Sequence, residues 1–240
     1  MIKENELEHS KKLLVNPDNI WGREGLIGEI RLERRAKMIK DFCLIWPGKR
    51  VLEIGCGAGA LTEKLATTGA EITATDILPE FLTLTEDKTP NIKTQITDGE
   101  TLRGLPNDYF DAVVGLSILH HLDLDKALPN IYRVLKKGGS IAFSEPNMLN
   151  PQIALQKNVP IFKKAAGDSP DETALISFLM RRKLKKYGFS GVSIMPFDFL
   201  HPSIPDKYAR LAEKVGYAIE SFPFVNQIAG TLFIGAIKKI

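Results

Sequence analysis

The sequence predicts an α/β fold built around a largely parallel β-sheet. Segments with the pattern of buried strands alternate with helical segments along most of residues 50–145. Such alternation implies right-handed crossovers, which place successive strands parallel to one another. A glycine-rich turn follows the first strand, and acidic or polar residues close the strands that come after it. Together these features predict a ligand site along the carboxyl ends of the strands.

The expected elements follow a regular order. Strands are predicted at residues 50–54, 71–75, 92–97, 111–116 and 140–144, and helices at 60–68, 79–87 and 124–135. Pro79 is a favourable residue for a first helical turn, and Gly69 is a favourable residue for a helix end. The glycines at 138 and 139 close the last of these helices in the same way.

Beyond residue 145 the regular order breaks. We expect residues 147–170 to be irregular, because prolines interrupt them repeatedly. A further helix and two further strands are then predicted at residues 171–187, 191–199 and 231–238. These two strands bring the predicted number to seven.

Three segments are candidates for a cover over the strand ends. Residues 1–45 are expected to form an N-terminal helical lid, and residues 46–240 the main domain. Within that domain, residues 147–170 and 200–228 are expected to be cap insertions, the second with a helical centre at 206–216. We expect the cap to be small and mainly helical.

Composition excludes several classes of protein. The 240 residues are 44% hydrophobic and 25% charged, values typical of a globular protein, and the net charge is only +3. The basic run at 181–186 fits an exposed helix face, so we predict no nucleic-acid partner. The N-terminus lacks the apolar core of a signal peptide, and no apolar run reaches the length of about 18 residues typical of a membrane span. We therefore predict a cytoplasmic location and no stable membrane insertion.

The most informative segment runs from Val51 to Leu61, with the sequence VLEIGCGAGAL. Gly55, Gly57 and Gly59 let the backbone pass close to a ligand, since no Cβ stands in the way. The helix that follows offers unpaired N–H groups to an anionic ligand group. This segment, which includes Cys56, resembles motif I of the class I S-adenosylmethionine (SAM) methyltransferases, E/D-x-G-x-G-x-G.

The glycine turn alone leaves the ligand open. Residues 55–60 also satisfy G-x-G-x-x-A, a form of the dinucleotide-binding fingerprint. A nicotinamide-dependent oxidoreductase is therefore one alternative function, and a SAM-binding subunit without activity is another.

Four consecutive strand ends agree with the resemblance. It implies that Glu53 supports the methionine amino group, that Asp76 with its neighbour Ile77 binds the ribose, and that Asp98–Gly99 contacts adenine. It implies further that the backbone of Leu116–Ser117 faces the sulfonium and the amine. The resemblance also implies a Rossmann-like sheet of seven strands with helices on both faces, in which only the last strand runs antiparallel.

A histidine pair strengthens the resemblance. The segment Ile118–Asp123, with the sequence ILHHLD, resembles an L-H-H element of many small-molecule methyltransferases of types 11 and 12. His120 or His121 is a candidate base for an acceptor proton, because the pKa of histidine lies near working pH. Glu145, at the end of the neighbouring strand, is a candidate to orient the histidine or bind substrate.

The N-terminal segment with Trp21–Gly22 and Gly28–Arg31 resembles the entrance helix of some bacterial class I methyltransferases, which has the pattern W-G…G-x-x-R. Arg31 is predicted to meet the methionine carboxylate and Trp21 to cover the cofactor. Apolar tips at residues 159–162, 199–202 and 222–225 suggest a hydrophobic acceptor pocket, although they could equally pack the cap onto the core. The predicted function is methyl transfer from SAM to an oxygen or nitrogen of a small, partly apolar metabolite, with no metal.

Overall fold

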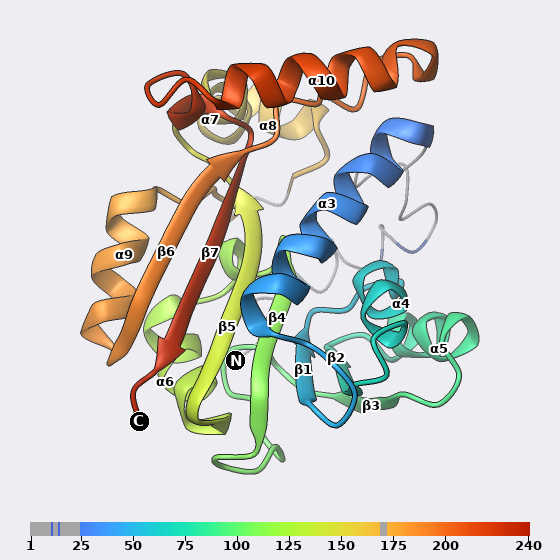
Figure 1. The fold of residues 1–240 in the computed structure, drawn as a ribbon, viewed down its shortest axis with the longest axis vertical. Coiled ribbons are helices and arrows are strands. Elements are labelled where there is room, and N and C mark those ends of the chain that lie inside the picture. The colour runs from blue at the N-terminus through green and yellow to red at the C-terminus, as the bar shows by residue number, and fades with distance from the viewer. Residues whose placement is uncertain (1–10, 12–13, 15–24, 169–171) are drawn as a thin grey trace.

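The structure is a computed structural model. The structure describes residues 11, 14, 25–168 and 172–240. Within these residues, seven strands form one sheet in the order β3-β2-β1-β4-β5-β7-β6. Strand β7 runs antiparallel to both β5 and β6, and the other neighbouring strands are parallel (Figure 1). The predicted α/β fold with an antiparallel last strand is therefore confirmed.

The strands are β1 (Arg50–Ile54), β2 (Glu71–Asp76), β3 (Lys93–Ile96), β4 (Phe110–Leu116), β5 (Leu135–Pro146), β6 (Phe189–Phe197) and β7 (Thr231–Lys238). The α-helices in the described ranges are α3 (Gly25–Cys43), α4 (Ala60–Ala66), α5 (Pro79–Lys88), α6 (Leu124–Val134), α7 (Pro151–Asn158), α8 (Pro160–Ala165), α9 (Ser177–Lys186) and α10 (Ala209–Glu220). A 3₁₀ turn, η1 (Leu119–His121), follows β4.

Helices cover both faces of the sheet because the central strands are apolar on both sides. Successive residues of a strand point to opposite faces of the sheet, and both Val51 and Leu52 of β1 are fully buried. Val51 packs in a cluster with α3 and α4, whereas Leu52 packs in a cluster with α6 and α9. Strand order reverses between β1 and β4, and in open α/β sheets ligands bind outside the carboxyl ends of the strands at such a point.

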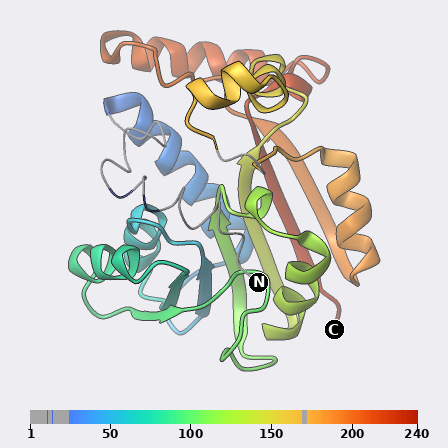
Figure 2. The same cartoon turned by 180° about the vertical axis from the view of Figure 1, so that it is seen from behind.

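A small cap lies above these carboxyl ends. It consists of α7, α8 and α10, which lie together at the top of the molecule in both views (Figure 1 and Figure 2). The prediction that residues 147–170 are irregular is wrong, since they contain α7 and α8. Pro151 and Pro160 begin these helices rather than interrupt them. Proline is well suited to a first helical turn, where its missing N–H leaves no hydrogen bond unmade.

Several boundaries differ from the predicted ones. Strand β5 begins five residues early, because Leu135 pairs with Phe110 before an irregularity in the β4–β5 register. Helix α9 begins at Ser177, and α10 lies slightly later than the predicted helical centre. None of the helices in the described ranges combines the length and the apolar character needed to cross a membrane.

Helix α3 packs against the sheet along its second half. Ala36 and Ile39 are fully buried, and the ring of Phe42 reaches β7 at Gly235. A Cβ on Gly235 would lie 2.6 Å from that ring, so a larger residue there would force the ring to move. The division of the chain at residue 45 stays a prediction, as does the role of residues 1–45 as a lid.

Candidate functional site

The turn between β1 and α4 depends on its glycines. Gly55, Gly57 and Gly59 have φ values of 66°, 52° and 80°, in the left-handed region that side chains with a Cβ rarely adopt. A Cβ on Gly55 would also lie 2.6 Å from the side chain of Ile118. The glycine turn therefore lies directly against the segment that begins the histidine turn η1.

Asp76 closes β2 beside the glycine turn. One carboxylate oxygen accepts a hydrogen bond of 2.9 Å from the backbone N–H of Gly57, and the other accepts from Ile77 and Leu78. Burial raises the pKa of Asp76, although these three N–H groups oppose the rise. The structure thus places the predicted ribose-binding carboxylate against the predicted cofactor turn.

Glu53 and Asp98 occupy the neighbouring strand ends. Glu53 is buried within β1 and accepts a 2.6 Å hydrogen bond from the hydroxyl of Thr62 in α4. Asp98 accepts from the backbone N–H of Glu100 at 2.7 Å, which closes an Asx turn. Gly99 packs against Ile54 and Leu122. Their roles toward the methionine amine and adenine stay predictions.

Ser117 follows Leu116, the last residue of β4, in an unusual conformation. Its φ is +52°, and its N–H donates to the carbonyl of Ser144 in β5. A non-glycine residue held at positive φ carries strain and is often found at a functional site. The turn at Ser117 directs the chain into η1, which carries both histidines.

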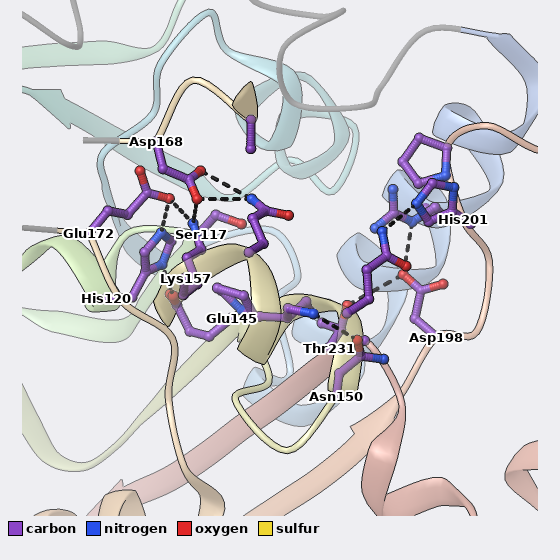
Figure 3. A pocket seen from close by; sticks show the side chains of 18 of the residues that line it. Ser117, His120, Glu145, Asn150, Lys157, Asp168, Glu172, Asp198, His201 and Thr231 are labelled. Atoms are coloured by element: carbon purple, nitrogen blue, oxygen red, sulfur yellow. Dashed lines mark hydrogen bonds and ion pairs between the residues drawn. The ribbon is translucent and has the colours of Figure 1, made fainter. Parts of the chain in front are cut away.

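Glu145 and His120 form the centre of the site (Figure 3). Nδ1–H of His120 donates to Oε2 of Glu145 at 2.7 Å. Oε1 of Glu145 accepts from the backbone N–H groups of Ile118 and Leu119, at 3.0 and 2.9 Å. Glu145, which the sequence predicted to lie beside the histidine pair, therefore fixes both the backbone of η1 and the ring of His120.

A second carboxylate faces His120 from the cap side. Nε2 of His120 lies 3.5 Å from an oxygen of Glu172. Burial opposes protonation of His120, but its contacts with Glu145 and Glu172 outweigh burial and raise its pKa to about 9. His120 therefore carries a proton on both nitrogens at neutral pH.

Glu172 continues the network into the cap. Burial alone would raise the pKa of Glu172, but His120 and Lys157 hold it well below its usual range. Lys157 of α7 forms ion pairs with Glu172 and with Asp168, the latter at 3.0 Å. The three side chains are at most 9% exposed. Sequence analysis missed them, because polar residues in a proline-rich segment carry no local signal of burial.

These residues line a pocket of about 570 Å³ between the cap and the strand ends. Among the predicted site residues, those that line it are Arg31, Ser117, His120, His121 and Glu145. Nε–H of Arg31 donates to Asp198 at 2.9 Å, and its contact with the methionine carboxylate stays a prediction. His201 also lines the pocket and pairs with Gln152. Trp21 lies outside the described residues.

The pocket is more polar than the apolar tips predict. Residues 199–202 line it, but Phe162 and Phe224 of the other two tips point to solvent and are 47% and 92% exposed. Four acidic side chains line the pocket: Glu145, Asp168, Glu172 and Asp198. Buried carboxylates are costly unless they are paired. Here Asp168 pairs with Lys157, Glu145 pairs with His120, and Asp198 pairs with Arg31 and Arg35.

Comparison with known proteins agrees with the geometry. Residues 52–143 match the sequence model of a family described as a methyltransferase domain. The ubiquinone biosynthesis O-methyltransferase of Xanthomonas oryzae pv. oryzae is 32% identical over 113 residues, covering 45% of this chain and 47% of that protein. Nodulation protein S of Rhizobium tropici is 29% identical over 142 residues, covering 56% of this chain and 58% of that protein. The chain thus spans about half the length of the curated relatives it matches.

The fold extends the likeness over most of the chain. An S-adenosylmethionine-dependent methyltransferase from Mesorhizobium loti has a TM-score of 0.66 at 18% identity, covering 86% of this chain and 100% of that one. At this identity the likeness concerns the fold alone. The family match, the strand order and the glycine turn agree, so residues 52–143 hold a methyltransferase domain, within a chain whose fold is that of S-adenosylmethionine-dependent methyltransferases.

Proposed function

We propose that this protein transfers a methyl group from SAM to an oxygen or nitrogen atom of a small metabolite. The observation that carries the proposal is the contact between two sites. The glycine turn, where the family binds SAM, packs against Ile118, and Ile118 begins the turn that presents His120 and His121 to the pocket. A methyl donor and an acceptor bound at these two places would be neighbours.

Such a reaction depends mainly on placement. The methyl group of SAM is already electrophilic, so the enzyme must hold a nucleophile in line with it, roughly 3 Å away in a pocket that excludes water. Ser117, with its strained backbone, and Glu145, which accepts hydrogen bonds from two N–H groups of the turn after β4, make the boundary between the two sites rigid.

The two histidines differ in their surroundings. His120 is buried, charged at neutral pH and held by carboxylates on both ring nitrogens, so it is suited to donate hydrogen bonds. His121 also lines the pocket, and its ring centroid lies 4.1 Å from that of His120. We therefore assign removal of the acceptor proton to His121. We assign to His120 the role of positioning the acceptor.

The pocket favours an acceptor with both polar and apolar parts. Phe199 and Leu200 line one region, whereas Asn150, Gln156 and the charged network line another. A relative named as an O-methyltransferase supports oxygen as the first acceptor atom to test. A cytoplasmic location and the absence of a nucleic-acid partner remain predictions of the sequence.

Calorimetry with S-adenosylhomocysteine and with NAD tests the cofactor. We expect one S-adenosylhomocysteine molecule to bind each chain, whereas NAD binding alone would support the oxidoreductase alternative. Labelled SAM with a panel of phenols, alcohols and amines then tests activity. Binding without methyl transfer to any acceptor would support the alternative of a SAM-binding subunit without activity.

A further inference from the structure

Three metal-ligand side chains converge on one side of the acceptor pocket. One ligand atom each from His120, His121 and Glu172 lies within 4.8 Å of the other two. Nε2 of His120 and an oxygen of Glu172 are 3.5 Å apart. Ligands held at roughly 2.0–2.2 Å from one ion are separated by about 3–4 Å. We propose that these three residues bind a divalent transition-metal ion.

Glu145 prepares His120 to act as a ligand. Its carboxylate holds Nδ1–H at 2.7 Å, which leaves Nε2 directed toward Glu172 (Figure 3). Histidine ligands commonly donate their other ring N–H to a carboxylate, which fixes the ring and makes the ligating nitrogen more basic. Glu145 is itself fixed by two backbone N–H groups, so the His120 ring is oriented before any ion arrives.

Charge within the cluster favours a divalent cation. Glu145, Asp168 and Glu172 carry three formal negative charges, and Lys157 contributes one positive charge. The ion would displace the proton from Nε2 of His120, and with both histidines then neutral two negative charges remain, which one divalent ion would neutralise. Lys157 contacts both Asp168 and Glu172, so it can keep its partner Asp168 when the ion takes Glu172.

The donor set indicates which ions fit. Two imidazole nitrogens and one carboxylate oxygen suit Zn²⁺, Co²⁺, Ni²⁺ or Fe²⁺, whereas Mg²⁺ and Ca²⁺ prefer oxygen ligands throughout. Three protein ligands also leave positions for a molecule from the pocket, as in catalytic rather than structural zinc sites.

The role of the ion rests on the proposed function. With the ion bound, His121 would serve as a ligand instead of as the base, and an acceptor hydroxyl on the ion would have a lowered pKa and would release its proton to water. Its oxygen would then form a bond to the methyl carbon while the carbon–sulfur bond breaks, with the electron pair left on the sulfur of S-adenosylhomocysteine. The acceptor class is therefore a hydroxyl compound, such as a phenol, rather than an amine.

Cobalt titration of the untagged, chelator-treated protein tests the site directly. Bound Co²⁺ is followed by its visible absorption, and Zn²⁺ is then added as a competitor. We expect a saturable spectrum from one ion per chain, and affinity more than about tenfold weaker in Glu172→Gln and in His121→Gln. His201→Gln is the matched control, because His201 lines the same pocket but pairs with Gln152; we expect its affinity to stay within about twofold of the unaltered protein.

Two results would overturn the site. One is a lack of saturable Co²⁺ binding by the unaltered protein, and the other is equal affinity in Glu172→Gln, His121→Gln and the unaltered protein. Thermal melts of each variant establish that it is folded. Calorimetry with S-adenosylhomocysteine in excess chelator is run in parallel. If that ligand binds and Co²⁺ does not, the metal site alone is wrong, and the opposite result contradicts the proposed function.

Discussion

The carboxylate of Glu145 joins the imidazole of His120 to the backbone of the turn that carries it. Oε2 accepts from Nδ1–H of His120 at 2.7 Å, and Oε1 accepts from the N–H groups of Ile118 and Leu119. One buried side chain at the end of β5 thus fixes the first turn after β4. Charge-assisted hydrogen bonds of this kind are about twice as strong as neutral ones, so the histidine has little freedom to rotate.

Glu145→Gln should lower the pKa of His120 from about 9 toward its ordinary value, because the amide removes one negative charge beside the ring. We expect turnover to fall by roughly 10- to 100-fold, while affinity for S-adenosylhomocysteine stays within about twofold. Imidazole NMR titration measures the pKa. Glu213→Gln, in a surface ion pair with Arg210, is the control. A pKa of His120 that does not move would contradict the arrangement.

Stability should decline in mildly alkaline solution because of His120. Its folded pKa of about 9 lies above the ordinary value of 6.5, so the stabilising contribution is complete below pH 6.5 and is lost as pH rises through 9. Its size is on the order of 3 kcal/mol. Urea unfolding with chelator at pH 6, 8 and 10 measures the decline. His120→Asn should show a smaller decline over the same range, and an equal decline would assign the effect to other groups.

Asp76→Ala should weaken S-adenosylhomocysteine binding by roughly 30- to 150-fold. The reason is the loss of a charge-assisted contact to the ribose worth about 2–3 kcal/mol. Part of the loss would come from the glycine turn, whose Gly57 N–H loses its acceptor. Calorimetry compares this variant with Asp87→Ala, an exposed carboxylate on α5. An unchanged dissociation constant would count against the ribose assignment.

Gly55→Ala should weaken cofactor binding and lower the melting temperature, since the new Cβ would lie 2.6 Å from Ile118 and displace the histidine turn. Gly48→Ala is the control variant, because it introduces backbone strain at a positive φ without a steric clash. Gly48 also has a positive φ, but a Cβ there would meet nothing within 4 Å. We expect Gly48→Ala to lose only the stability that positive φ costs, about 1–2 kcal/mol. Equal losses of cofactor affinity in both variants would show that the contact with Ile118 is unimportant.

Cofactor should protect the cap insertions at residues 147–170 and 200–228 from proteolysis, because the pocket lies between the cap and the strand ends. Chymotrypsin can attack Phe162 and Phe224, which are exposed in these insertions. Phe178 on α9 is 58% exposed outside them and serves as an internal reference. We expect S-adenosylhomocysteine to slow cleavage at the cap sites relative to Phe178. Identical rates with and without ligand would mean that the cap does not respond to cofactor.

The sequence by itself determined the sheet and the glycine turn. Strands β1 to β4 and helices α4 to α6 lie within a few residues of their predicted positions, because buried strands and capped helices leave periodic patterns in adjacent residues. Glycine at residues 55, 57 and 59 predicted a tight turn, and the positive φ values there confirm it. These features depend on neighbours along the chain, which a sequence contains directly.

Only the tertiary structure decided the chemistry of the histidine pair. The pattern at residues 118–123 suggested a base, yet the carboxylates of Glu145 and Glu172 outweigh burial and keep His120 charged at neutral pH. Lys157 belongs to the segment expected to be irregular and Glu172 to the predicted helix at 171–187, and the burial of both results from cap packing over the strand ends. A pKa depends on the charges and the solvent that surround a group in space. Residues distant along the chain supply both, so the local sequence could name His120 but not its protonation state.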